Sequence, residues 1–215
     1  MDNFFTILEK RVLTPSAFVL RFERKHIEFK AGQYLSVGLA GEPQARDYSV
    51  YSAENDPYVE IMVKQIDNGT VSRQLSQCKK GDRLRILGPR GNFNLHKEVI
   101  GSRKHLFIAT GTGISPFHSF VKSNPALNYL LIHGVRKDEE AYERNDYDTS
   151  RYVLCCSREE TGDYHGRVTG YLKTLPVEKN SVAYLCGNGD MIFEVFEILV
   201  NKGIGVENIH TEIYF

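Results

Sequence analysis

The chain of 215 residues carries 27 basic and 27 acidic side chains, so its formal net charge is zero, and 41% of its residues are hydrophobic. This composition is typical of a folded globular protein with enough length for two compact domains, and it excludes a disordered chain. Without a net positive charge or a long basic run, nucleic acid and anionic membrane surfaces are not expected partners. A charged partner would have to bind a local patch of opposite charge.

The cysteines and the N-terminus further limit the kinds of protein that the sequence can encode. The cysteines, Cys78, Cys155, Cys156 and Cys186, follow neither a disulfide framework nor the ligand spacing of zinc and iron–sulfur centres, so no metal is expected. The N-terminus lacks an apolar run of signal-peptide length, and no stretch of about eighteen apolar residues occurs. We expect a cytoplasmic protein without integral membrane association.

Residues 1–100 read as an all-β domain. Strand-like runs separated by turn residues lie at 4–14, 17–23, 33–39, 46–52, 58–64 and 82–88. Their spacing predicts an antiparallel barrel or sandwich. One short helix is expected at 70–78, where Val71 and Leu75 are apolar at i and i+4.

Residues 101–215 follow a different pattern, which predicts an α/β domain. Apolar runs at 105–110, 129–135, 151–157, 182–188 and 209–215 alternate with helical patterns at 115–123, 138–144, 168–175 and 191–203. Strands that are apolar throughout and alternate with helices indicate a parallel sheet covered on both faces. Five strands are expected.

Two glycine turns in this half suggest a nucleotide site. The segment GTGISP directly follows a predicted strand, and its Gly111 and Gly113 would let the backbone approach a pyrophosphate, while Pro116 suits the first turn of a helix. The segment CGNGDMI, which begins at Cys186, occupies the same position after another strand. Parallel sheets bind ligands at the carboxyl ends of their strands, so the turns would line one crevice. Ordinary turns, and a buried Cys186, are the alternative.

A third strand ends in Ser157 and Arg158, and Arg167 follows after a short loop. A hydroxyl and two guanidinium groups suit the 2′-phosphate of NADP, whereas a carboxylate would suit the free 2′-hydroxyl of NAD. Glu159 and Glu160 keep both nucleotides open, and a solvated polar loop is the alternative.

The segment RDYS at 46–49 has the alternation of a half-buried strand, whose Arg46 would simply reach water. In chain order, however, RDYS, GTVS, GPRGNF, GTGISPF, SR with GR, and CGNGDMI together resemble the ferredoxin–NADP reductase family over nearly the whole chain. The resemblance implies an all-β antiparallel barrel that binds flavin at 1–100, followed by an α/β parallel-sheet domain at 101–215 that binds NAD(P). The implied cofactors are FAD and NADP(H).

By this resemblance, Arg46 would neutralise the FAD pyrophosphate, Tyr48 would pack against the isoalloxazine or ribityl chain, and Ser49 would lie near flavin N5. A planar guanidinium matches phosphate oxygens, and an aromatic ring offers a flat face to a flavin. A second phosphate cradle would be formed by Gly69, Thr70, Val71 and Ser72. The same residues would also serve a plain helix N-cap.

The resemblance also implies a catalytic set of Ser49, Cys186, Glu212 and Tyr214. The tail ends in Phe215, and the sequence does not choose whether Tyr214 or Phe215 would stack on the flavin; a core strand with packed aromatic side chains is the alternative. The implied NADP contacts are Gly111, Thr112, Gly113, Pro116, Ser157, Arg158, Arg167, Cys186, Gly187 and Met191.

The implied function is electron transfer between NADPH and a small one-electron carrier, ferredoxin or flavodoxin, by a protein expected to be a monomer. The carrier would be a separate molecule, because the cysteines do not match the ferredoxin spacing. Two alternatives remain open. One is an NAD(P)H-dependent flavin reductase or the reductase component of an oxygenase, and the other is a non-catalytic flavin-binding electron-relay subunit.

Overall fold

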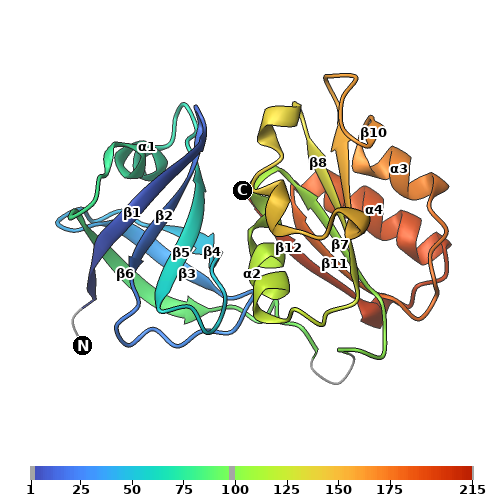
Figure 1. Cartoon of the computed structure of the whole chain (residues 1–215), viewed down its shortest axis with the longest axis horizontal. Coiled ribbons are helices and arrows are strands. Elements are labelled where there is room, and N and C mark those ends of the chain that lie inside the picture. Colours follow the sequence, from blue (N-terminus) through green and yellow to red (C-terminus); the bar gives the residue numbers. More distant parts are fainter. Residues whose placement is uncertain (1–2, 97–99, 215) are drawn as a thin grey trace. The chain divides into compact units, whose positions relative to one another are not determined.

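The computed structural model describes residues 3–96 and 100–214 (Figure 1). The chain divides into two compact units, Met1–Asn94 with Ser115–Ser123, and Leu95–Ile114 with Asn124–Phe215. Among the described residues, no helix has both the length and the apolar character needed to cross a bilayer.

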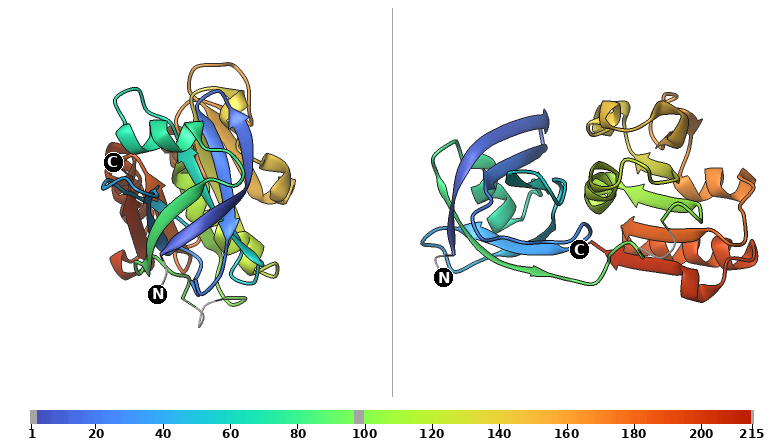
Figure 2. Two further views of the ribbon diagram at one scale, coloured as in Figure 1. Left: turned by 90° about the vertical axis from the view of Figure 1, so that its left-hand side faces the viewer. Right: turned by 60° about the horizontal axis from the view of Figure 1, so that its bottom comes forward.

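The first unit contains one antiparallel sheet in the strand order β4-β3-β6-β1-β2-β5. Its strands are β1 (Phe4–Thr14), β2 (Ala17–Glu23), β3 (Tyr34–Leu39), β4 (Arg46–Ser49), β5 (Tyr58–Lys64) and β6 (Arg83–Arg90). Just after β4, Val50 forms a bridge to Ile61 in β5, which joins the two ends of the sheet. The predicted antiparallel barrel is thereby confirmed, and Figure 2 shows its curved strands.

The barrel interior is filled by alternate side chains of its strands, as the period of two requires. Leu20 and Phe22 of β2 are fully buried in the same core as Val59 and Ile61 of β5. The helix α1 (Thr70–Gln77) adds Val71 and Leu75 to this core, as their spacing predicts. Burying a side chain such as Leu75 contributes about 2 kcal/mol.

The helix α2 (Ser115–Ser123) also belongs to the first unit, although it directly follows the first glycine turn in sequence. The imidazole of His118 stacks on the ring of Tyr51, with centroids 3.7 Å apart and planes within 4°. Hydrogen bonds tie the helix to the segment after β4: His118 Nδ1 with the Tyr51 carbonyl (2.7 Å), Ser119 Oγ donating to the Ser52 carbonyl (2.7 Å), and Glu54 N donating to Ser123 Oγ (2.9 Å).

The second unit contains a parallel sheet in the order β10-β9-β8-β7-β11-β12. Its strands are β7 (His105–Thr110), β8 (Tyr129–Val135), β9 (Tyr152–Cys156), β10 (Tyr164–His165), β11 (Val182–Gly187) and β12 (Ile209–Ile213). The parallel sheet is confirmed with six strands rather than five. The additional strand, β10, is two residues long and pairs with β9, so its sequence is too short to show any periodicity.

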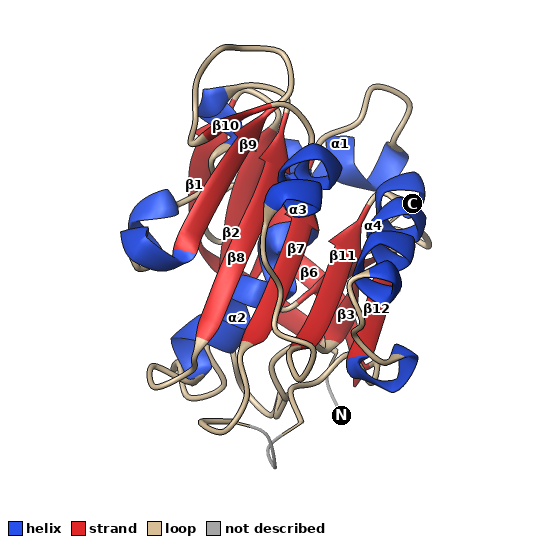
Figure 3. Ribbon diagram, turned by 90° about the vertical axis from the view of Figure 1, so that its right-hand side faces the viewer, coloured by secondary structure: helices blue, strands red, loops and turns tan. Residues whose placement is uncertain are grey.

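Two helices, α3 (Val168–Thr174) and α4 (Gly189–Asn201), lie over one face of this sheet (Figure 3). Successive strand residues alternate between the faces. Leu106 and Ile108 of β7 pack in one core with Val195 and Leu199 of α4, while Phe107 between them points to the opposite face. That face is rich in aromatic side chains, including Tyr129 and Tyr184, which contact Phe107.

The helix expected at 138–144 does not form. Two short 3-10 turns, η3 (Asp138–Glu140) and η4 (Arg144–Asp146), take its place. Glu143 adopts a left-handed conformation with φ of 45°, which a right-handed helix cannot include. Further 3-10 turns are η2 (Gly111–Ile114), η5 (Thr149–Arg151) and η6 (Val206–Asn208).

Candidate functional site

The RDYS segment of the first unit places three of the candidate flavin-binding residues on β4. The side chain of Arg46 is exposed and its Nη1 donates to the carbonyl of Ala45, and no described carboxylate forms an ion pair with it. Tyr48 is half-buried, and this burial raises the pKa of its phenol to about 12 against the opposing effect of Arg46, so the ring is neutral at physiological pH. Ser49 is buried beside it. The strand therefore presents an uncompensated cation next to a neutral aromatic ring.

The GTVS segment forms the start of α1. Gly69 is the N-cap, no side chain caps the first turn, and that turn carries no acidic residue. The hydroxyl of Ser72 instead accepts a hydrogen bond from the backbone of Ile66. Thr70 is exposed, whereas Val71 is buried in the barrel core. A helix N-terminus without a side-chain cap suits an anion, because its N–H groups and dipole are positive.

In the second unit, the two glycine turns lie against each other at the carboxyl ends of β7 and β11. The backbone N–H of Asn188 donates to Thr110 Oγ1 at 3.0 Å. A side chain at Gly113 would place its Cβ 2.4 Å from the carbonyl oxygen of Cys186, so only glycine allows this approach. The sequence folds in this way because both turns follow neighbouring parallel strands of one sheet.

The rest of each glycine segment is also placed. Thr112 lies in the 3-10 turn η2, and Pro116 is buried in the first turn of α2. At the other turn, the side chain of Asn188 caps α4 by accepting from the backbone N–H of Met191, whose own side chain is buried. Gly187 accepts from the backbone N–H of Tyr214 at 2.9 Å.

The candidate 2′-phosphate residues follow the carboxyl ends of β9 and β10. Ser157 and Arg158 come directly after β9, and Arg167 stands at the N-cap position of α3 just after β10 without a capping hydrogen bond from its side chain; all three side chains are exposed. The backbone N–H of Arg158 donates to the carbonyl of Arg136, which follows β8 and is also exposed. Three guanidinium groups therefore come from the ends of three neighbouring strands, and no described carboxylate forms an ion pair with any of them.

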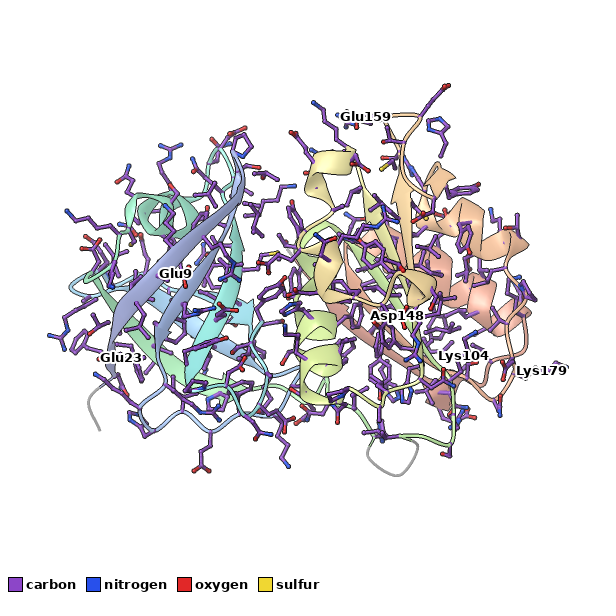
Figure 4. All side chains as sticks on the ribbon, in the orientation of Figure 1. Glu9, Glu23, Lys104, Asp148, Glu159 and Lys179 are labelled. Carbon is purple, nitrogen blue, oxygen red and sulfur yellow. The ribbon has the colours of Figure 1, made fainter. Side chains whose placement is uncertain are left out.

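Two acidic residues of the same loops have backbone partners. Glu159 accepts from the backbone N–H of Asp138, and Glu140 accepts from that of Arg136, each at 3.0 Å. Figure 4 labels Glu159 in its loop beyond the sheet. Glu160 is exposed. The fixed carboxylates thus hold the backbone of these loops, while the arginine side chains remain at the surface.

The C-terminal strand brings three of the four candidate catalytic residues together. Cys186 of β11 is in register with Glu212 of β12, and its thiol receives a hydrogen bond from Tyr214. Burial, reinforced by the carboxylate of Glu212, raises the pKa of the Cys186 thiol well above its ordinary value, against the opposing hydrogen bond. The thiol is therefore protonated at neutral pH and provides a small uncharged packing surface rather than a nucleophile.

The fourth candidate, Ser49, lies in the first unit, and Phe215 lies outside the described residues. Sequence reasoning missed Arg136, although a basic residue directly after a strand is the signal that identified Arg158. It also missed His133 of β8, whose ring is fully buried between Gly111 and Tyr152. A single histidine in an apolar strand gives no signal of such a contact.

Comparison with protein families matches both halves of the chain. Residues 5–95 match the oxidoreductase FAD-binding domain, and residues 107–196 match the oxidoreductase NAD-binding domain. The chain thus carries an FAD-binding domain followed by an NAD-binding domain.

Curated relatives match nearly the whole chain at low identity. The phenol hydroxylase P5 protein of Acinetobacter pittii is 27% identical over 96% of this chain and 64% of its own length. The toluate 1,2-dioxygenase electron transfer component of Pseudomonas putida is 28% identical over 94% of this chain and 64% of its own length. Ferredoxin–NADP reductase B of Sorangium cellulosum is 27% identical over 95% of this chain and 94% of its own length. The chain therefore spans about two thirds of the first two relatives.

Solved structures share the fold. The ferredoxin NADP+ reductase of Neisseria gonorrhoeae, determined with bound FAD and NADP, superposes with a TM-score of 0.86 at 24% identity and covers all of both chains. The FAD/NAD-binding domain of a nitric oxide dioxygenase from Vibrio cholerae gives a TM-score of 0.87 at 21% identity, covering 99% of this chain and 98% of that one.

Proposed function

Because the chain belongs to the ferredoxin–NADP reductase family of flavin-dependent oxidoreductases, we propose that it transfers electrons between NADPH and a separate one-electron carrier such as ferredoxin or flavodoxin. Bound FAD would supply the exchange between hydride transfer and single-electron transfer. The chain's own residues would bind and orient the two dinucleotides.

The first unit has the groups that a flavin dinucleotide needs. The exposed Arg46 would neutralise a phosphate, and the uncapped start of α1 at Gly69 would offer backbone N–H groups to the same diphosphate. The neutral ring of Tyr48 would provide a flat apolar surface, and the hydroxyl of Ser49 would donate a hydrogen bond. Arg46 would bind the phosphate without breaking an ion pair to any described carboxylate.

The second unit would hold the nicotinamide nucleotide at its glycine turns. Gly111 to Gly113 would face the pyrophosphate, and Gly187 would allow the nucleotide to approach the end of β11. The protonated thiol of Cys186 would exclude water next to the nicotinamide. Glu212 would keep a negative charge beside that thiol, and Tyr214 would cover it until the nicotinamide arrives.

NADPH is proposed rather than NADH because of the arginine cluster. A 2′-phosphate carries about −1.5 to −2 charges, and three exposed guanidinium groups, those of Arg136, Arg158 and Arg167, would stabilise it. Glu159 is held by the backbone of Asp138, so it is already engaged in its loop.

The observation that carries the proposal is the pairing of the two glycine turns. Their contact through Thr110 and Asn188, together with the close approach of Gly113 to Cys186, brings two glycine turns together at the carboxyl ends of neighbouring strands. This edge of a parallel sheet is the position at which dinucleotides bind.

The test is an anaerobic titration of the purified protein with NADPH and, separately, with NADH, with the flavin absorbance bands recorded and the released cofactor identified. We expect FAD to be released, and bleaching by NADPH at a much lower concentration than by NADH. A flavin that neither nucleotide reduces would instead favour a non-catalytic relay subunit. A colourless protein that binds no added flavin would contradict the proposal altogether.

A second candidate is the reductase component of an oxygenase, because the phenol hydroxylase and toluate dioxygenase components match nearly the whole of this chain. The two candidates differ in the electron acceptor. NADPH-dependent reduction of cytochrome c that requires added ferredoxin or flavodoxin would support the carrier reductase. Reduction of an oxygenase component without such a carrier would support the second candidate.

A further inference from the structure

A buried hydrogen-bond chain reaches the first glycine turn from β8. The ring of His133 is fully buried, with Nε2 2.9 Å from the carbonyl oxygen of Gly111 and Nδ1 2.7 Å from the hydroxyl of Tyr152. His133 and Tyr152 lie on neighbouring strands, and their side chains project from the same face of the sheet.

The chemistry of the partners sets the direction of these hydrogen bonds. A carbonyl oxygen only accepts, so Nε2 carries the proton and donates to Gly111. Nδ1 of the neutral ring is then an acceptor, and the hydroxyl of Tyr152 donates to it. Burial raises the pKa of Tyr152, which keeps that donor proton in place. The chain is complete, because each of its polar atoms has a partner of the right kind.

The anchored carbonyl belongs to the residue at which the turn is most easily deformed. Gly111 has a φ of 53°, in the left-handed region, and a Cβ at this position would meet nothing within 4 Å. Close packing at Cβ therefore does not restrain Gly111, which begins the hydrogen-bonded 3-10 turn η2. The hydrogen bond from His133 adds a side-chain restraint on the Gly111 carbonyl to those of the turn itself.

That orientation decides which polar groups face the crevice. A trans peptide is planar and places its C=O and N–H on opposite sides. With the Gly111 oxygen directed to His133, the N–H of Thr112 is directed the opposite way. A rotated peptide would present a carbonyl oxygen there, which repels a phosphate, whereas an N–H attracts it.

We infer that His133 is a positioning residue that holds the Gly111–Thr112 peptide in the orientation required to bind the pyrophosphate of a nicotinamide dinucleotide. This inference rests on the proposed function. His133 acts through Gly111, whose carbonyl selects the tautomer with the proton on Nε2, and Tyr152 donates to the remaining ring nitrogen.

Three variants separate positioning from a structural role. His133→Phe removes the donor but keeps a ring of similar size, and His133→Gln keeps an N–H donor of similar reach. The double variant H133F/Y152F also removes the hydroxyl that H133F leaves buried without an acceptor, so it is expected to recover stability. Tyr152→Phe alone is the matched control, because it removes a buried polar group of the same chain while leaving the bond to Gly111.

The experiment measures NADP+ binding by calorimetry and amide hydrogen exchange of the turn in the nucleotide-free protein. We expect H133F and H133F/Y152F to bind NADP+ about tenfold more weakly, as the loss of one buried hydrogen bond predicts. Residues 110–114 should exchange faster in both, whereas H133Q and Y152F should stay within about threefold of wild type. FAD content should be unchanged in all of them.

Two results would overturn the inference in distinguishable ways. If the wild-type protein binds NADP+ and a stable H133F/Y152F variant binds it with equal affinity, His133 has no positioning role and the proposed function still stands. Wild-type protein that binds neither NADP+ nor NAD+ would remove both.

Discussion

The arginine cluster at the ends of β8, β9 and β10 yields a quantitative prediction for nucleotide selectivity. Replacing Arg158 by glutamine removes one positive charge and keeps a polar side chain of similar shape. At about 4 Å, a unit charge pair contributes about 1 kcal/mol in a water-like dielectric, which is appropriate because Arg158 is exposed. The 2′-phosphate carries about −1.5 to −2 charges, and physiological salt screens part of the attraction.

The expected loss is therefore about 1–1.5 kcal/mol, or about tenfold in affinity for NADPH, with NADH unaffected. The assay is kcat/KM for NADPH and for NADH with ferricyanide as acceptor, at low and high salt. Lys179→Gln is the matched control, since Lys179 precedes β11 and so lies at the opposite end of the sheet from Glu159 and the cluster (Figure 4). Equal losses for both nucleotides with R158Q, or a loss with K179Q as large as with R158Q, would refute the reasoning.

Three further predictions concern the C-terminal residues, Gly113 and Cys155. Deleting Tyr214 and Phe215 removes the hydrogen bond from Tyr214 to the Cys186 thiol and should change the ratio of NADPH to NADH turnover; unchanged kinetics with both nucleotides would exclude a gating role. Gly113→Ala should lower the free energy of unfolding by about 3 kcal/mol in urea denaturation, because its Cβ would meet backbone that cannot move aside; an unchanged midpoint would contradict this. Burial raises the pKa of the Cys155 thiol from 9.0 to about 12, so as the pH rises this thiol ionises in the unfolded chain before it ionises in the folded protein. The free energy of unfolding should therefore fall by about 1.4 kcal/mol per pH unit between about pH 9 and pH 12. The variant Cys155→Ala should reduce this slope.

The parts of the fold that the sequence predicts are those with enough residues to show a period. The helix α1 is evident from Val71 and Leu75, and the second-unit strands β7, β8, β9 and β11 appear as largely apolar runs. The strand β10 is too short for any pattern, and the expected helix at 138–144 is interrupted by the left-handed Glu143, which the helical pattern does not reveal.

The residues of the candidate site also differ in how well the sequence predicts them. The glycine turns and Arg158 have local sequence signals, because each directly follows a recognisable strand. The contact of His133 with Gly111 spans 22 residues, and that of His118 with Tyr51 spans 67. Such contacts depend on how distant segments pack, and a single sequence contains no periodicity that reports them.

Because α2 belongs to the first unit, the positions at which this protein can be divided into fragments are limited. The chain passes between the units at residues 94/95, 114/115 and 123/124, so neither unit is a continuous stretch of sequence. A fragment beginning near residue 101 would carry Phe117 and Phe120 of α2 without the barrel residues, such as Phe93, that cover them. The barrel expressed alone would in turn lose the ring stacked on Tyr51. Neither half is therefore expected to behave as an autonomous fragment, and an exchange of halves between relatives would have to transfer α2 together with the barrel.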